Sequence, residues 1–314
     1  MTIDFILCIS ISDMKEVRVK LIGGLGNQIF GYIAGYWFSQ KLRANLLLDF
    51  SEISHKHSKF DITSFKLNAH SVNMDKGNHF FRNLRTRATA SMDYRFSKSF
   101  QRWDLFTHRY NDQGFDQNNL FQSHKDKIIL RGYFQDLRYF DKYFEDNYSL
   151  QLNTISDNFK SHVNEIQQSN QLAIHIRRGD FLSNKKFHGV LDFNWYLKVL
   201  RMFEDLSPNP TRIWVFSNDI AWCKTMFSRI NKLSSYDILY ITEDELRDPA
   251  EHLMLFSMAP NKVCANSTFS IISAKIGKGL VFAPTVITRS QEQTGLAMSY
   301  PSNWIKVDPV WEGV

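Results

Sequence analysis

The sequence predicts an α/β protein with two Rossmann-like domains, residues 15–160 and residues 161–300. Two observations lead to this class. Across residues 172–283, apolar segments of strand length alternate with segments of helical spacing, which is typical of a parallel sheet flanked by helices. A strand, turn, helix and strand order also occurs near the N-terminus, and 314 residues correspond to about two domains.

The N-terminal half begins with an apolar strand at residues 17–22. Apolar residues at helical spacing predict a helix over residues 29–42, and the apolar run NLLLDF predicts a second strand. Residues 55–119 show no readable order, and basic residues cluster between residues 82 and 102. This cluster is interpreted as a solvated face, or alternatively as a surface for an anionic or membrane-linked acceptor.

The order becomes regular after residue 126. KIILRGYF predicts a strand, and helices are expected within residues 134–150 and 155–168. In the C-terminal half the expected strands are LAIHIRR, RIWVFS, YDILYIT, KVCA and GLVFA, and the expected helices lie near FNWYLKVLRMFE, from Ala221, from Asp248 and at STFSIISAKI.

Composition excludes several classes of protein. Lys and Arg number 38 against 32 Asp and Glu, and this excess of 6 positive charges favours anionic ligands such as phosphates but is too small to predict nucleic-acid binding. The three cysteines form neither a disulfide framework nor a zinc ribbon. The apolar segment at residues 5–11 is far shorter than the roughly 20 residues that span a bilayer. We expect a cytoplasmic protein.

The first segment that carries chemistry is GGLGNQ, where a strand becomes a helix. Gly24 and Gly26 allow a ligand to approach the backbone, and Asn27 and Gln28 add amide groups beside the free N–H groups of the helix start. The turn partly resembles a dinucleotide fingerprint, with Asp49 as the ribose-binding acid, so a nicotinamide-dependent oxidoreductase is an alternative. A tight turn with a helix cap is the structural alternative.

The second segment is HIRRGDF, which ends an apolar strand with polar residues. Ligands of open parallel sheets lie beyond the carboxyl ends of the strands, so this is the expected place for a site. The guanidinium groups of Arg177 and Arg178 offer paired donors for phosphate oxygens. The structural alternative is an ion pair with Asp180 that stiffens the loop.

Two further strands end in polar residues. In NSTFS, hydroxyl groups and exposed N–H groups at a helix start predict a second anion site. In FSND, Asp219 is a candidate acceptor for a nucleobase or ribose, or a helix cap. The sequence contains no Asp-x-Asp pair, so arginines and helix starts would have to neutralise a departing diphosphate.

Together, GGLGNQIF, RGYFQDLRYF, HIRRGDF, WVFSNDIAWCK and LMLFSMAPNKVCANSTFS resemble glycosyltransferase family 11, the α-1,2-fucosyltransferases. The resemblance runs in order from residue 23 to residue 270. It implies a GT-B-like fold in which the two domains face a cleft, with the acceptor on the side of residues 15–160 and GDP-fucose on the side of residues 161–300. It also implies inversion at the fucose anomeric carbon and no metal or other cofactor.

The resemblance assigns roles to matching positions. Catalytic roles fall on Arg177, Arg178, Asp180 and His188, with at least one arginine on the GDP diphosphate. The donor-binding residues implied by the motifs are Gly24, Gly26, Asn27, Gln28, His175, Ser217, Asp219, Asn266, Ser267, Thr268, Phe269 and Ser270. FSND corresponds to a family pattern written FSDD, so Asn218 stands in place of an acid.

The expected reaction is attack by the 2-hydroxyl of a galactose on C1 of fucose while GDP leaves, with charge developing on the diphosphate. Asp180 and His188 are candidate bases, Asp136 is a weaker candidate, and structural roles are open for each. The expected partners are GDP-fucose and a galactose-terminated oligosaccharide or lipid-linked glycan of an O-antigen or capsule. Peripheral membrane contact is open, and a non-catalytic nucleotide- or glycan-binding protein is a further alternative.

Overall fold

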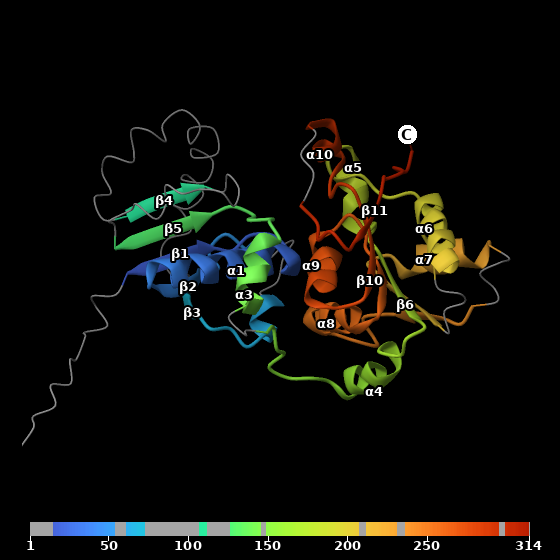
Figure 1. The fold of residues 1–314 in the computed structure, drawn as a ribbon, viewed down its shortest axis with the longest axis horizontal. Helices are drawn as coiled ribbons and strands as arrows, with labels where there is room; N and C mark the ends of the chain where they lie inside the picture. Colours follow the sequence, from blue (N-terminus) through green and yellow to red (C-terminus); the bar gives the residue numbers. More distant parts are fainter. Residues whose placement is uncertain are drawn as a thin grey trace, which may run out of the picture. The chain divides into compact units, whose positions relative to one another are not determined.

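The computed structural model describes residues 15–53, 61–72, 107–111, 126–145, 149–206, 212–230, 236–294 and 299–313. The chain forms two compact units (Figure 1). The N-terminal unit contains most residues before residue 150, and the C-terminal unit contains the residues from Leu150 onward together with the short segments Asp61–Lys66 and Gln135–Leu137. The basic cluster at residues 82–102 lies outside the described residues.

The N-terminal unit contains a parallel five-stranded sheet with the strand order β3-β2-β1-β5-β4. In the central strand, Val19 lies opposite Leu48 on one side and Leu130 on the other. The bounds are Glu16–Lys20 for β1, Asn45–Asp49 for β2, His70–Val72 for β3, Thr107–Asn111 for β4 and Lys127–Arg131 for β5. The edge strands β3 and β4 belong to the region in which the sequence shows no readable order.

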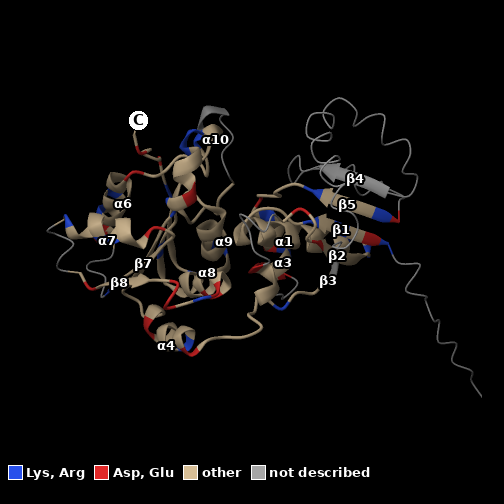
Figure 2. Ribbon diagram, turned by 180° about the vertical axis from the view of Figure 1, so that it is seen from behind, with Lys and Arg blue, Asp and Glu red and all other residues tan. Residues whose placement is uncertain are grey.

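Helix α1 (Leu25–Leu42) is buried on nearly every side, and Figure 2 shows it almost free of charged residues. Its glycines let it approach β1 closely. A Cβ atom at Gly35 would lie 2.2 Å from Cγ2 of Val19, which is too short for any contact. Helix α3 (Arg138–Glu145) packs on α1 through aromatic rings, including Phe30 and Phe140 with centroids 5.4 Å apart.

The C-terminal unit contains a parallel six-stranded sheet with the order β11-β10-β9-β6-β7-β8. All residues of β6 are buried, as a strand covered on both faces should be. The bounds are Gln171–Ile176 for β6, Arg212–Ser217 for β7, Ile238–Ile241 for β8, Asn261–Val263 for β9, Leu280–Pro284 for β10 and Ile305–Val307 for β11.

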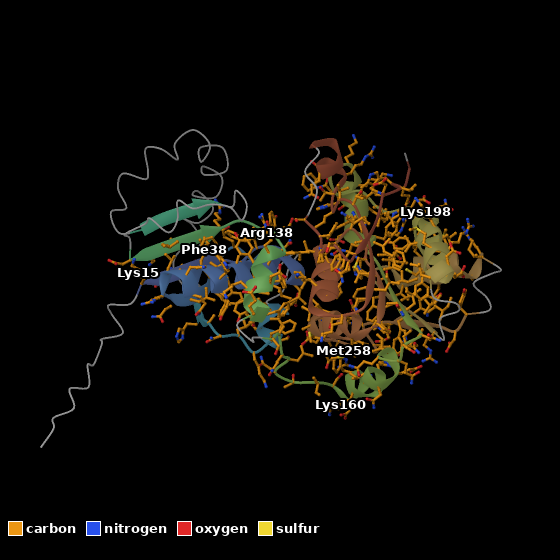
Figure 3. The ribbon with its side chains drawn as sticks, viewed as in Figure 1. Lys15, Phe38, Arg138, Lys160, Lys198 and Met258 are labelled. Carbon is orange, nitrogen blue, oxygen red and sulfur yellow. The ribbon has the colours of Figure 1, made fainter. Side chains whose placement is uncertain are left out.

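Helices flank this sheet. On α6, Trp195 and Val199 are buried, whereas Lys198 is exposed (Figure 3). The bounds are Asp157–Ile166 for α4, Lys185–His188 for α5, Phe193–Leu206 for α6, Ile220–Ser228 for α7, Pro249–Met258 for α8, Thr268–Ile276 for α9 and Arg289–Thr294 for α10, with short 3-10 helices at Asp61–Ser64 (η2) and Gly179–Asn184 (η4). No helix in the described part of the chain has the length and apolar character needed to cross a membrane.

The predicted α/β class is therefore confirmed, with a parallel sheet and flanking helices in each unit. The predicted helices occur with small shifts in their ends, and side-chain caps set where α4, α7, α8 and α9 begin. Asp219, for example, accepts a hydrogen bond from the N–H of Trp222 and starts α7, and Asp248 accepts one from Ala250 and starts α8.

Candidate active site

Polar side chains gather at the carboxyl edge of the six-stranded sheet. Strands β7, β6 and β9 are neighbours and parallel, so the residues that follow them lie at one edge. Arg177 and Arg178 follow β6, Asn218 and Asp219 follow β7, and Asn266 lies just beyond β9. The structure thus brings together the three predicted segments HIRRGDF, FSND and NSTFS.

Asn218 connects the ends of β6 and β7. Its Oδ1 accepts hydrogen bonds from the backbone N–H groups of Arg178, at 3.0 Å, and of Gly179, at 3.2 Å. Its Nδ2 donates to Oδ1 of Asp180 at 3.0 Å. An amide can accept and donate in this way, whereas a carboxylate could not donate to Asp180. The absence of an acid at this position therefore has a local structural reason.

Arg178 is neutralised by two carboxylates. Its Nε lies 3.3 Å from Oδ2 of Asp219, and its Nη1 pairs with Oε2 of Glu312. Its guanidinium carbon lies 4.5 Å from the ring centroid of Trp222, a cation–π distance. Only 13% of the side chain is exposed. An arginine held in this way is better suited to fixing the loop than to receiving a phosphate.

Arg177 has fewer partners. Its Nη2 donates to Oδ2 of Asp180 at 2.8 Å, and 31% of its side chain is exposed. Its guanidinium carbon lies 5.5 Å from the ring centroid of Phe181. The Nε of Arg177 is buried and has no hydrogen-bond partner among the described residues; the Nε of Arg178 likewise makes no hydrogen bond there, but it lies in the ion pair with Asp219. The ion pair with Asp180 considered from the sequence is thus present, and this arginine keeps an unused donor.

His175 lies inside the core beneath this edge. It is 4% exposed, and its ring stacks on Phe269 of α9 with centroids 5.0 Å apart. Burial lowers the pKa of His175 to about 3, with smaller contributions from the nearby charges of Arg177 and His252. His175 is therefore neutral at pH 7 and joins β6 to α9. Direct donor contact by His175 stays a prediction.

His188 stands at the end of α5 and stacks on Phe181, with ring centroids 4.4 Å apart. Burial lowers the pKa of His188, Asp180 opposes this shift, and Arg177 adds to it. The neutral, proton-accepting form is therefore favoured at neutral pH. The position of the helix end is fixed by Asn266, whose Nδ2 donates to the carbonyls of His188 at 3.0 Å and Gly189 at 3.2 Å.

The serine and threonine residues after β9 have different surroundings. Ser267 caps α9, since its Oγ accepts from the N–H of Phe269 at 3.3 Å. Ser270 is buried and donates to the carbonyls of Ala265 and Ser267. Thr268 is the half-buried first residue of the helix. Thr268 thus marks the half-buried helix start, whereas Ser267 and Ser270 are both buried and hold the turn together.

The two predicted donor residues after β7 both take part in local structure. The Oγ of Ser217 accepts from the N–H of Asp219 at 3.0 Å. Asp219 caps α7 and pairs with Arg178. The helix cap considered from the sequence is therefore present, and nucleotide binding by these two residues stays a prediction.

Sequence reasoning missed Trp222 and Glu312 at this site. Trp222 stands within WVFSNDIAWCK but in the apolar pattern of a helix, which gives no sign of a cation above its ring. Glu312 is 134 residues from Arg178, and no motif surrounds it. Only the fold brings these three residues together.

The residues of GGLGNQ lie in the N-terminal unit, at the start of α1. Gly24 is exposed, Gly26 is buried, and Asn27 is half-buried beside Gly23, which has φ of 72°. Gln28 is fully buried, and its Nε2 donates to the carbonyl of Gly23 at 2.9 Å. The amide of Gln28 thus closes the turn, while Gly24 leaves backbone uncovered.

The surroundings of Asp49 do not favour ribose binding. Asp49 is 3% exposed, and its Oδ1 accepts from the N–H of Ser51 at 2.9 Å. The expected acid of a dinucleotide site therefore closes a turn. Asp136, the weaker base candidate, lies half-buried between β5 and α3. Within the described ranges, no group of three His, Cys, Asp or Glu side chains could hold a metal ion, and metal independence stays a prediction.

Comparisons with known proteins give the family. The model described as "Glycosyl transferase family 11" matches residues 11–308. An alpha-1,2-colitosyltransferase of Escherichia coli is 27% identical over 311 residues, covering 94% of this chain and 100% of that protein. The O-antigen biosynthesis glycosyltransferase WbnK of Escherichia coli is 28% identical over 269 residues, covering 80% and 86% respectively.

A solved structure supports the fold. A mutant of FUT1 from Arabidopsis thaliana in complex with GDP matches with a TM-score of 0.52 and 13% identity, covering 86% of this chain and 70% of that chain. At this identity the likeness concerns the fold. Because the family match extends over nearly the whole sequence and includes every motif at the sheet edge, the chain belongs to glycosyltransferase family 11.

Proposed function

We propose that this chain transfers L-fucose from GDP-fucose to the 2-hydroxyl of a galactoside in an O-antigen or capsule, with inversion and without a metal ion. One observation carries the proposal: at the carboxyl edge of the sheet, Arg177 follows β6 with 31% of its side chain exposed and with Asp180 as its one carboxylate partner among the described residues, and β6 pairs with β9, the strand that precedes α9. Family membership and the two Escherichia coli relatives, one named for a 1,2 linkage and one for O-antigen biosynthesis, support it.

In the proposed reaction, the acceptor oxygen forms a bond to C1 of fucose on the face opposite GDP. The bond between C1 and the β-phosphate oxygen breaks, and its electron pair leaves with GDP. Arg177 and the N–H groups at the start of α9 would stabilise the growing negative charge on the diphosphate. Arg178 would act through the loop rather than on the phosphate, because two carboxylates already hold it.

A general base must accept the proton of the acceptor hydroxyl. Asp180 accepts a hydrogen bond from Arg177 at Oδ2 and one from Asn218 at Oδ1, so both of its carboxylate oxygens are already engaged. We therefore favour His188, whose pKa is lowered by burial below its ordinary value of 6.5. A base must be unprotonated to act, so kcat/KM should be constant above pH 6.5 and should fall only as the pH drops below it.

Colitose is the second candidate donor sugar, because the colitosyltransferase matches 94% of this chain. Colitose differs from fucose in lacking the 3-hydroxyl. A site that hydrogen-bonds this hydroxyl would discriminate strongly against colitose, whereas a site without such a contact would accept both sugars. A comparison of kcat/KM for GDP-fucose and GDP-colitose therefore tests the donor.

The deciding experiment is a screen of both donors against galactosyl acceptors, with the linkage and anomeric configuration of the product determined by NMR. Formation of an α-1,2-fucosyl galactoside, unchanged in EDTA, is expected. Loss of turnover in EDTA would contradict metal independence. Thermal stabilisation by NAD and not by GDP would favour the oxidoreductase, and GDP-fucose binding without transfer to any acceptor would favour a binding protein.

A further inference from the structure

The guanidinium of Arg178 is enclosed from three directions by residues of different segments. Asp219 comes from the end of β7, Trp222 from α7, and Glu312 from the segment after β11. The backbone N–H of Arg178 is bound by Asn218. Its side chain and its main chain are thus both fixed, and with them the turn between Arg177 and Asp180.

Glu312 is itself held by contacts that do not involve Arg178. Its N–H donates to the carbonyl of Val190 at 2.7 Å. The adjacent Trp311 is 8% exposed and packs against Gly189, where a Cβ atom would lie 2.4 Å from the Cε3 atom of the indole.

Two further bonds hold the same segment. The carbonyl of Val310 accepts from the N–H of Asp192 at 2.8 Å, and the carbonyl of Asp308 accepts from Nε1 of Trp195 at 3.1 Å. Residues 308–312 therefore form a rigid support for the carboxylate of Glu312.

We propose that Glu312 is a positioning residue of the donor site. Its carboxylate holds Arg178 on Trp222, and this fixes the Arg178–Gly179 turn so that Arg177 is directed to the diphosphate. Without this carboxylate, Arg178 would have one anionic partner fewer and would compete with Arg177 for Asp180. Glu312 lies beyond residues 11–308, so the family match assigns it no role. The inference rests on the proposed function.

The first test is Glu312→Gln, which keeps the shape of the side chain and removes its charge. Expected is a fall in kcat of about 10-fold, the scale of effect seen when outer partners of metal ligands are removed. The KM for the donor should change less, because the charge on the diphosphate grows as the bond breaks. GDP, which carries the full charge of the leaving group, should bind more weakly. Glu312→Asp should recover part of the loss.

Asp308→Asn is the matched control. This residue lies in the same segment, is exposed, and engages Trp195 through its backbone carbonyl, which the substitution leaves in place. It should retain the kcat and the GDP affinity of the natural sequence. Melting temperatures of all variants report whether each is folded. For Glu312→Gln we expect a lower kcat at an unchanged melting temperature.

The second test is a double-mutant cycle with Arg178→Met, whose apolar stem can still pack on Trp222. If Glu312 acts through Arg178, adding Glu312→Gln to Arg178→Met should cause no further loss of kcat. An equal loss in both backgrounds, or a normal kcat and GDP affinity of Glu312→Gln, would overturn the inference. If no donor is transferred even by the unaltered chain, the proposed function fails, and GDP affinity across the same cycle still decides the role of Glu312.

Discussion

The turn after β1 and the turn after β6 follow the central strands of their sheets, but they are built differently. The first consists of glycines and amides, and one of its own residues, Gln28, closes it. The second carries both arginines, and residues from distant segments close it: Asn218, Asp219 and Glu312. The comparison teaches that an uncharged turn can be completed locally, whereas a turn that concentrates charge needs partners that only the fold can supply.

The largest effect should come from the cation of the second turn. Arg177→Ala is expected to lower kcat by about 100- to 1000-fold, the range for removal of one preorganised donor to a developing negative charge. The measurement is steady-state transfer at saturating donor. Arg229→Ala, at an exposed arginine after α7, is the control and should be unchanged. If Arg178→Met proved more damaging than Arg177→Ala, the assignment of the two arginines would be reversed.

In the first turn, substitutions at Gly24 and Gly23 test two different things, ligand contact with the backbone and strain of the backbone. Gly24 has φ of −76°, and a Cβ atom added there would have no other atom within 4 Å, so Gly24→Ala should cost only the favoured N-cap residue of α1 and should reduce stability less than Gly23→Ala. If a ligand lies on this backbone, the added methyl should weaken donor or acceptor binding by roughly 10-fold, the scale of a steric overlap of about 1–3 kcal/mol.

Gly23→Ala provides the contrast. Its φ of 72° and a contact of 2.6 Å with Nδ2 of Asn27 strain the folded state directly. The free energy of unfolding in urea should therefore fall by about 1–3 kcal/mol. Normal KM values for Gly24→Ala with both substrates would place the ligands elsewhere than on this turn.

Asn218→Asp adds one negative charge to the second turn and so tests whether that turn tolerates a charge without a partner. The new carboxylate would lie about as close to Asp180 as the amide does now, at 3.0 Å, and would lose the hydrogen bond to it. Salt screens the repulsion between two partly exposed charges, so kcat should fall several-fold more at low than at high ionic strength. An equal effect at both ionic strengths would show that the lost hydrogen bond, rather than charge, is responsible.

The smallest expected effect concerns stability in acid. His175 has a pKa of about 3 in the fold against 6.5 when exposed, so the unfolded chain binds a proton at this residue between these values and the folded chain does not. The contribution of neutral His175 to the free energy of unfolding is thus fully present above pH 6.5 and is lost as the pH falls toward 3. His175→Phe should reduce the loss of unfolding free energy between pH 7 and pH 5, measured in urea.

In His175→Phe the free energy of unfolding should still fall between pH 7 and pH 5, but less steeply, because burial also lowers the pKa values of His188 and His252. An unchanged slope in His175→Phe would mean that His175 is hydrated in the folded state. His70→Phe, at a histidine of the edge strand β3, serves as a control for the substitution itself.

Much of the fold could be predicted because its signals are local. The buried strand β6 reads as a continuous apolar run, and the caps Asp219, Asp248 and Ser267 mark the helices after β7, β8 and β9. The edge strands β3 and β4 carry polar residues and give no such signal. They are strands because a neighbour pairs with them, which is a property of the sheet and not of their own residues.

For the candidate site, the sequence predicted the loops but not the role of each residue within them. Motif positions located the loops after β6, β7 and β9, but could not distinguish Arg177 from Arg178, because the distinction depends on which carboxylates reach each guanidinium. The same holds for Ser267 and Ser270, which are alike in sequence and both buried but differ in hydrogen-bond direction.

The ion pair between Arg178 and Glu312 also has a consequence for biosynthesis. The ribosome adds Glu312 134 residues after Arg178, which at about 5–20 residues per second takes roughly 7–27 s. During that interval β6 to β10 can already assemble, while Arg178 has only Asp219 as an anionic partner. Chains that lack residue 312 and chains that contain it should therefore differ in how firmly the turn after β6 is held, and GDP binding is the measurement that compares them.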